Sequence, residues 1–181
     1  VAGGVRGPDR PGGNSLAEGQ VFGHRAGAAA AERSKRVDIS SSSETTFNNT
    51  LSFINEVLER GHPKFDINEA EYNLRKAMQT YCLVEKDEIG LQKALSIIEE
   101  IYHQFDSGLG ATTLSRTLSL RNMVDASRLV LKACLQRKET RSGHYRKDFT
   151  ITDNTHYQGA FIWKKEPDGL RSWLHTYAMT K

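Results

Sequence analysis

The chain has 181 residues, of which 38% are hydrophobic, so it can form one domain of ordinary size with a moderate core. Its 25 basic and 22 acidic residues give a formal net charge of only +3, which does not indicate a nucleic-acid partner. No apolar run approaches the ~18 residues that a membrane span needs.

The N-terminal segment predicts a loop followed by a helix. Residues 1–14 are rich in Gly and Pro, which excludes a helix there. Ser15 and Glu18 match a capping box, in which each side chain bonds a backbone N–H of the first turn. We therefore expect a helix over about 16–33, with small apolar residues on one face.

Further helices are predicted along the rest of the chain. The serine-rich residues 34–46 are typical of a linker, and apolar residues at helical spacing predict a short helix over 47–58. The same periodicity predicts longer helices over about 67–82, 88–105 and 113–137. Three helices with short connections are typical of an antiparallel bundle.

The last part of the chain predicts two strands. Residues 160–163 form an apolar strand pattern, 167–169 (PDG) are a turn signal, and 170–177 can return as the second strand. The predicted fold class is thus mostly α, with a three-helix bundle and a C-terminal β-hairpin.

The start of the first helix is a candidate site for an anion or a polarised carbonyl. Free N–H groups at Ser15 and Leu16 can donate there, and Arg10 lies just before them in the Gly-rich loop. A guanidinium suits a carboxylate ligand. On these residues alone, a solvated loop arginine beside an ordinary helix cap is the simpler interpretation.

Two motifs resemble a known enzyme family. The stretches 10–16 (RPGGNSL) and 21–27 (VFGHRAG) look like the late FAD-domain motif of the succinate dehydrogenase/fumarate reductase/L-aspartate oxidase flavoproteins. The stretches 120–123 (LRNM) and 137–148 (RKETRSGHYRKD) resemble the C-terminal signature of the same family. The resemblance covers nearly the whole chain.

This resemblance implies roles for named residues. Arg10 would bind a carboxylate of a dicarboxylate substrate. Asn14, Ser15 and Leu16 would contact the flavin of FAD, and Glu18 would be an acid of the flavin domain at the helix start. The sequence departs from the family pattern at Arg6, Pro8, Asp9 and Pro11, and Asp9 can pair with Arg10 and weaken its hold on a dicarboxylate, so the substrate need not be succinate or fumarate itself.

The resemblance also implies a domain organisation. Residues 1–36 would be the last segment of a truncated FAD-binding α/β domain, 37–66 a linker with a short helix, and 67–181 the C-terminal helical domain with its hairpin. The chain has no G-x-G-x-x-G opening a βαβ unit and none of the family's capping domain. We therefore expect a C-terminal fragment or subunit of an FAD-dependent oxidoreductase, with no catalytic residue sufficient on its own and inactive alone.

Alternatives remain open at this point. The parent could be an L-aspartate oxidase, the chain could be one subunit of a split enzyme, or it could be a non-enzymatic helical assembly module. The expected partners are the upstream FAD-binding and capping portion and an iron–sulfur subunit. The expected location is the cytoplasm, with membrane association only through partner subunits.

Three further groups of residues have simpler interpretations. Cys82 and Cys134 are far apart, follow no metal spacing, and are interpreted as reduced, buried thiols rather than a disulfide. The histidines show no ligand spacing, so no metal site is predicted. The charged cluster from Arg141 to Arg146 is interpreted as structural ion pairs rather than a catalytic site.

Overall fold

We analysed a computed structural model of the chain, which describes residues 14–37, 44–59, 66–106, 114–166 and 169–176. The chain divides into two compact units, residues 1–56 and 57–181, and each is described here by itself.

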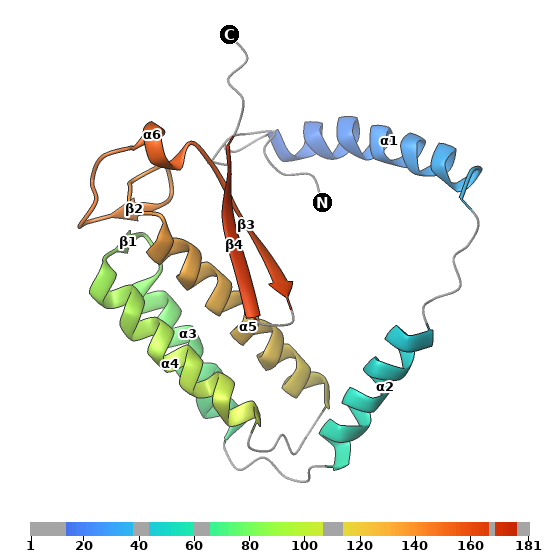
Figure 1. Cartoon of the computed structure of the whole chain (residues 1–181), viewed down its shortest axis with the longest axis horizontal. Coiled ribbons are helices and arrows are strands. Elements are labelled where there is room, and N and C mark those ends of the chain that lie inside the picture. The colour runs from blue at the N-terminus through green and yellow to red at the C-terminus, as the bar shows by residue number, and fades with distance from the viewer. Residues whose placement is uncertain (1–13, 38–43, 60–65, 107–113, 167–168, 177–181) are drawn as a thin grey trace. The chain divides into compact units, whose positions relative to one another are not determined.

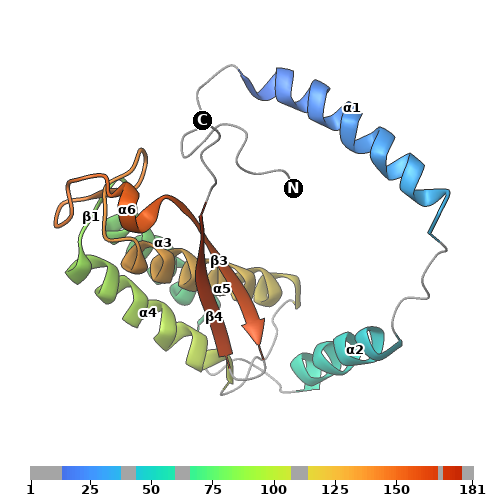
Figure 2. The ribbon, with the colours of Figure 1, turned by 45° about the horizontal axis from the view of Figure 1, so that its top comes forward.

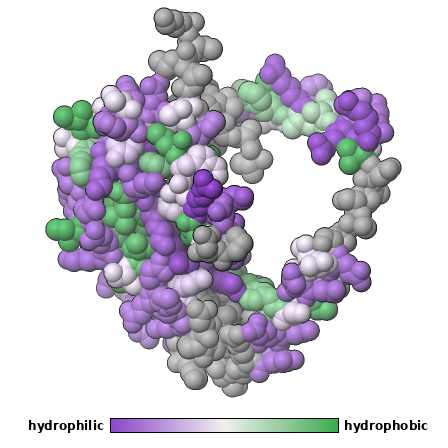
Figure 3. Space-filling model, viewed as in Figure 1, coloured by the Kyte–Doolittle hydropathy of each residue, from purple (hydrophilic) through white to green (hydrophobic). Residues whose placement is uncertain are grey.

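The first unit contains helix α1 (Asn14–Ser34) and most of helix α2 (Glu44–Glu59), at the positions the sequence predicts. Apolar side chains of both helices are exposed: Leu16 is 76% exposed, Val21 49% and Phe47 63%. Figure 3 shows hydrophobic residues at the surface of α1. These helices therefore find little apolar cover among the described residues.

The second unit is built on the predicted three-helix bundle of α3 (Ile67–Tyr81), α4 (Glu88–Asp106) and α5 (Leu114–Gln136). Helix α3 begins where the Asp66 side chain accepts a hydrogen bond from the Asn68 N–H at 2.8 Å, which caps the first turn. Successive helices run in opposite directions (Figure 1), and each pair among the three is in contact.

The core of the bundle comes from apolar residues that recur every three or four positions on each helix. Their side chains are almost completely buried. They are Ile67, Ala70, Leu74 and Ala77 from α3, Leu91, Ala94, Ile98 and Ile101 from α4, and Leu120, Val124 and Leu131 from α5. Two polar residues of α5, Thr117 and Ser127, are buried beside them, which hydrophobic periodicity does not predict.

The predicted hairpin is present as strands β3 (Gly159–Glu166) and β4 (Gly169–Thr176). They pair antiparallel from Gly159 opposite Thr176 to Glu166 opposite Gly169. The hairpin lies along α5 in both ribbon views (Figures 1 and 2), and Ser172 in β4 donates to Gln136 in α5 at 3.2 Å. Residues 167–168 of the predicted turn lie outside the described residues.

Two small elements lie at the end of the bundle where α3 stops and α4 starts. Strand β1 (Glu85–Lys86) pairs parallel with strand β2 (Tyr145–Arg146), and the short helix α6 (Asn154–Tyr157) precedes β3. The backbone N–H of Lys147 donates to the carbonyl of Lys86 at 2.8 Å. This pairing attaches the segment after α5 to the connection between α3 and α4.

Candidate functional site

Helix α1 opens the first candidate site, the one that the family resemblance implies. Ser15 and Leu16 are exposed in its first turn, and that turn carries no acidic residue. The first turn therefore carries no acid of its own to neutralise the positive end of the helix dipole. These features fit a ligand with an anionic or carbonyl acceptor. Arg10 and the side chain of Asn14 lie outside the described residues.

Helix α1 is described from Asn14, about two residues before the predicted start, so Ser15 lies within its first described turn. Glu18 is only partly exposed, one turn into the helix. The structure thus keeps Ser15, Leu16 and Glu18 close together on one helix start, and their contact with a flavin remains a prediction.

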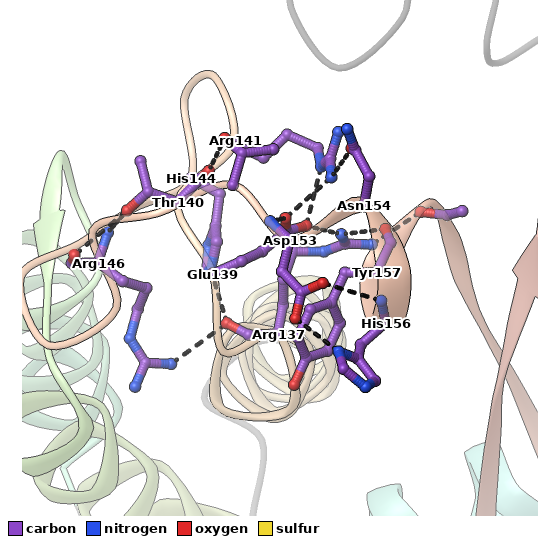
Figure 4. Close-up of polar contacts among 12 residues, drawn as sticks. Arg137, Glu139, Thr140, Arg141, His144, Arg146, Asp153, Asn154, His156 and Tyr157 are labelled. Carbon is purple, nitrogen blue, oxygen red and sulfur yellow. Dashed lines mark hydrogen bonds and ion pairs between the residues drawn. The ribbon is translucent and has the colours of Figure 1, made fainter.

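The second candidate site is the charged segment that follows α5, and its centre is a buried carboxylate (Figure 4). The side chain of Glu139 has no exposed surface. Arg141 donates to it through Nε at 2.8 Å and Nη2 at 2.9 Å, the Asp153 N–H donates at 2.8 Å, and Arg137 forms a further ion pair. Burial alone would raise the pKa of Glu139, but the bonds from Arg141, Asp153 and Arg137 outweigh it and lower the pKa.

A buried guanidinium lies close to this carboxylate. Arg146 has no exposed surface and forms a bidentate pair with Asp148, at 2.8 Å from Nε and 2.7 Å from Nη2. It also donates to Glu88 at 3.0 Å and to the carbonyls of Cys134 at 2.7 Å and Arg137 at 3.5 Å. The bond from Arg146 is the main reason why the pKa of Asp148 is lowered to about 2.

Arg137 joins this segment to the hairpin. Its guanidinium donates to the carbonyls of Tyr157 at 2.9 Å and Gly159 at 2.8 Å. It also lies over the ring of Phe161, 5.1 Å from the ring centroid. The carbonyl oxygens at the end of α6 and the start of β3 are thereby held against the end of α5.

His144 is a partly buried imidazole in this segment. Its Nε2 lies 3.0 Å from the carbonyl oxygen of Arg137 and donates to it in the matching tautomer. Burial, helped by the nearby Lys86, Arg146 and Arg137, lowers the pKa of His144. The ring is therefore mostly neutral at pH 7 and occupied by a backbone bond.

The arrangement of these charges is that of a structural network. The two fully buried charges, Glu139 and Arg146, are both paired with neighbouring charges, in line with the interpretation as structural ion pairs. Within the described residues, no group of His, Cys, Asp and Glu side chains could hold a metal ion. Among the helices that the structure describes, none is both long and apolar enough to cross a bilayer.

Sequence reasoning missed two features of this end of the molecule. The motif 137–148 identifies Arg146 and Glu139 as members of a charged cluster, but nothing local shows that both are fully buried. Cys82 and Cys134 are free thiols in the structure, and both are partly exposed rather than buried as predicted.

The chain is similar to known proteins. A family model described as the fumarate reductase flavoprotein C-terminal domain matches residues 71–178. An uncharacterised FAD-dependent oxidoreductase of Methanocaldococcus jannaschii is 38% identical, over 96% of this chain and 31% of its own length. One component of the CoM/CoB fumarate reductase of Methanothermobacter marburgensis is 32% identical, over 84% of this chain and 28% of its own length.

Two further matches extend the comparison. An L-aspartate oxidase of Caulobacter vibrioides is 34% identical, over 83% of this chain and 24% of its own length. A solved chain of E. coli quinol fumarate reductase superposes with a TM-score of 0.86 at 22% identity, over 98% of this chain and 32% of that one, which shows a shared fold. The chain thus spans about a third or less of the proteins it matches.

Proposed function

Because the chain belongs to the family of fumarate reductase flavoprotein C-terminal domains, we propose that it is the C-terminal part of an FAD-dependent oxidoreductase acting on a dicarboxylate. The observation that carries the proposal is the match to FAD-dependent relatives over nearly the whole chain. The RPGGNSL stretch at the head of α1 supports it, because that stretch resembles the family's flavin and substrate motif.

The start of α1 is the part of the chain that would complete the flavin site. Ser15 and Leu16 would offer N–H groups of the first turn, with Asn14 beside them, to an acceptor on the flavin ring. Glu18 would lie one turn further along the helix. When bound, the flavin supplies the two-electron chemistry. Donors and a helix N-terminus at the site favour an acceptor that gains negative charge.

Arg10 is the proposed substrate contact. A guanidinium in a Gly- and Pro-rich loop can bind a carboxylate through two parallel hydrogen bonds. The upstream portion of the parent would supply the remaining FAD-binding groups and the acid that donates a proton. The chain would therefore close the site rather than build it.

The bundle and hairpin have a scaffolding role in this proposal. Their core and their charged network are complete within the second unit, whereas the apolar residues of α1 lie exposed. The exposed face of α1 fits a helix whose sheet lies in the upstream FAD-binding portion. An iron–sulfur subunit is the proposed electron partner, and the proposed location is the cytoplasmic face of such an assembly.

A chimera tests the proposal. The upstream part of the M. jannaschii relative is joined to this chain at the aligned position before Arg10, and the product is assayed for bound FAD and for fumarate reduction by a reduced viologen. We expect bound FAD and turnover. Arg10→Met should lower kcat/KM roughly 10- to 100-fold with unchanged FAD content, because each hydrogen bond to a charged group contributes about 1.5–3 kcal/mol.

Arg25→Met is the matched control, because Arg25 lies in α1 over the ring of Phe22 and has no proposed contact with substrate. It should leave kcat/KM unchanged. A chimera that binds FAD but loses nothing when Arg10 is replaced would contradict the assigned substrate contact. A chimera that folds without FAD would contradict the proposed cofactor.

An L-aspartate oxidase parent is the second candidate, favoured by the similarity to the enzyme of C. vibrioides. The same chimera separates the two candidates. Hydrogen peroxide formed from L-aspartate and oxygen, without reduction of fumarate by the viologen, would select the oxidase. Reduction of fumarate by the viologen, without hydrogen peroxide from L-aspartate, would select a fumarate reductase.

A further inference from the structure

A cleft of about 520 Å³ lies between the bundle and the hairpin, and it shares no residue with either candidate site above. Its apolar and aromatic surface comes from four elements: Tyr102 in α4, Leu129 in α5, Trp163 in β3 and Leu170 in β4. Clefts of about 300–1,000 Å³ with such walls are typical of sites for small organic molecules.

Positive charge exceeds negative charge around this cleft. Three cationic residues and one acidic residue line it, namely Arg128, Lys132, Lys165 and Asp125. Nε of Arg128 and Nζ of Lys132 share one carboxylate, that of Glu99, at 3.0 Å and 3.1 Å. Asp125 lies 3.8 Å from Nη1 of Arg128. An anionic ligand would therefore be attracted to this cleft.

Two residues that line the cleft also carry buried donors without a hydrogen bond. Among the described residues, the buried side-chain atoms without such a partner are Nε1 of Trp163, Nε of Arg128 and Oγ1 of Thr117. Buried donors are almost always paired in native proteins. The first two atoms therefore indicate that an acceptor is missing here. Because Nε1 of Trp163 has almost no exposed surface, an acceptor would reach it through a rotation of the indole ring.

The guanidinium of Arg128 is fixed before any ligand binds. It lies over the ring of Tyr102, 3.6 Å from the ring centroid, and its side chain is only 17% exposed. The contact with Glu99 holds it from a second direction. A cation that is already ordered loses little conformational entropy when a ligand arrives, which favours binding.

We propose that this cleft binds a small carboxylate with an apolar body. The carboxylate would lie against Lys132 and Lys165, and one of its oxygens would accept the hydrogen bond from Trp163. The apolar body would lie between Leu129 and Leu170. The proposal does not depend on the proposed flavin function, because every residue it uses lies in the second unit of this chain.

Titration of the whole, nitrogen-labelled chain with cinnamate tests the cleft by NMR. The sequence has two tryptophans, so two indole N–H signals are expected. The Trp163 signal should shift saturably with millimolar cinnamate. The Trp173 signal should stay in place, because Trp173 pairs with Ile162, the neighbour of Trp163 in β3, and therefore lies on the other face of the hairpin. Trp173→Phe assigns the two signals without altering the cleft.

A neutral ligand and a pair of adjacent lysines are the matched controls. Cinnamyl alcohol has the same apolar body without the charge, and it should bind at least about tenfold more weakly than cinnamate. Lys165→Met should weaken cinnamate binding roughly two- to fivefold, as expected for an exposed cation. Lys164→Met should leave it unchanged, because successive side chains of a strand point to opposite faces.

Three results would overturn the proposal. The first is a Trp163 signal that does not move with millimolar cinnamate. The second is an equal shift of the Trp163 and Trp173 signals, which would indicate non-specific binding. The third is equal affinity for cinnamate and cinnamyl alcohol, which would exclude recognition of the carboxylate.

Discussion

Arg146 shows how a charged side chain can lie in a protein interior. A buried guanidinium is costly unless its donors find acceptors. Its Nε bonds Asp148, its Nη2 bonds Asp148 and Glu88, and its Nη1 bonds the carbonyls of Cys134 and Arg137. All three nitrogens are satisfied, and two carboxylates balance the charge. Removal of the guanidinium would leave those acceptors without a donor.

Arg146→Met should therefore destabilise the chain by about 3–5 kcal/mol, the usual cost of breaking a buried ion pair on one side. Lys147→Met is the matched control at the next position. Lys147 pairs with Glu85 at 2.7 Å, but the two side chains are 53% and 59% exposed, so solvent screens the pair and its loss should cost far less than the loss of Arg146. Urea unfolding followed by circular dichroism measures both changes. Equal losses of stability in Arg146→Met and Lys147→Met would contradict the explanation by burial.

Asp148 makes the stability depend on pH. Its folded pKa of about 2 lies below the ordinary value of 3.8, so the folded state favours the ionised form. The stabilisation is complete above about pH 4 and is lost as the pH falls through about 2. In urea unfolding between pH 5 and pH 2, the free energy of unfolding should fall less steeply for Asp148→Asn than for the unaltered chain. Parallel profiles would exclude Asp148 as a source of the acid sensitivity.

At the residue scale, the sequence predicts only part of this site. The motif 137–148 indicates a cluster of paired charges, because opposite charges alternate within a few positions. It does not identify Glu88, because that partner is 58 residues away and reaches Arg146 only after α4 has packed. Contacts with partners distant in sequence leave no local pattern.

At the element scale, the long helices and the hairpin were predictable because each has its own periodicity. Helix α4 was expected over 88–105 and is observed over Glu88–Asp106. Strands β1 and β2 were not predicted, because two residues cannot show an alternation and their pairing is distant in sequence. Helix α6 has only four residues and depends on the Asp153 cap.

Gly159 is the position where the hairpin allows no side chain. A Cβ there would lie 2.2 Å from the carbonyl oxygen of His175 and 2.8 Å from its carbon, in the backbone of the facing strand. Gly159→Ala should separate β3 from β4 at this end and cost about 1–3 kcal/mol. Gly143→Ala is the control, because a Cβ at Gly143 meets nothing within 4 Å. Thermal unfolding followed by tryptophan fluorescence compares them, and equal midpoints would contradict the expected clash.

At the scale of the whole molecule, the chain carries a complete bundle and only a small part of the proposed flavin site. The proposed contacts are confined to the head of α1 and the loop before it, and the motif for binding a dinucleotide pyrophosphate is absent from the sequence. Family membership was predictable from motifs in the sequence. The prediction that the chain matches only the C-terminal part of such enzymes is confirmed, because the chain spans about a third or less of the relatives.

The isolated chain should therefore leave FAD fluorescence and the visible flavin spectrum unchanged at micromolar FAD. A few N–H donors on one exposed helix start cannot orient or desolvate an isoalloxazine ring, so they provide little affinity. Fluorescence titration measures this, with the flavin-binding chimera as the positive control. Tight binding with a perturbed spectrum would show that this chain builds a flavin site without the upstream portion.

The position of Arg146 also has a consequence for synthesis on the ribosome. A chain is made from its N-terminus, and Glu88 emerges long before the arginine that neutralises it. During that interval the bundle helices can form, while Glu88 and the last carbonyls of α5 still face water. When the segment around Arg146 emerges, Arg146 binds both Glu88 and the end of α5, which lie far apart in the sequence. The segment after α5 therefore completes this end of the bundle late in synthesis, when Glu88 and the carbonyl of Cys134 gain their shared donor.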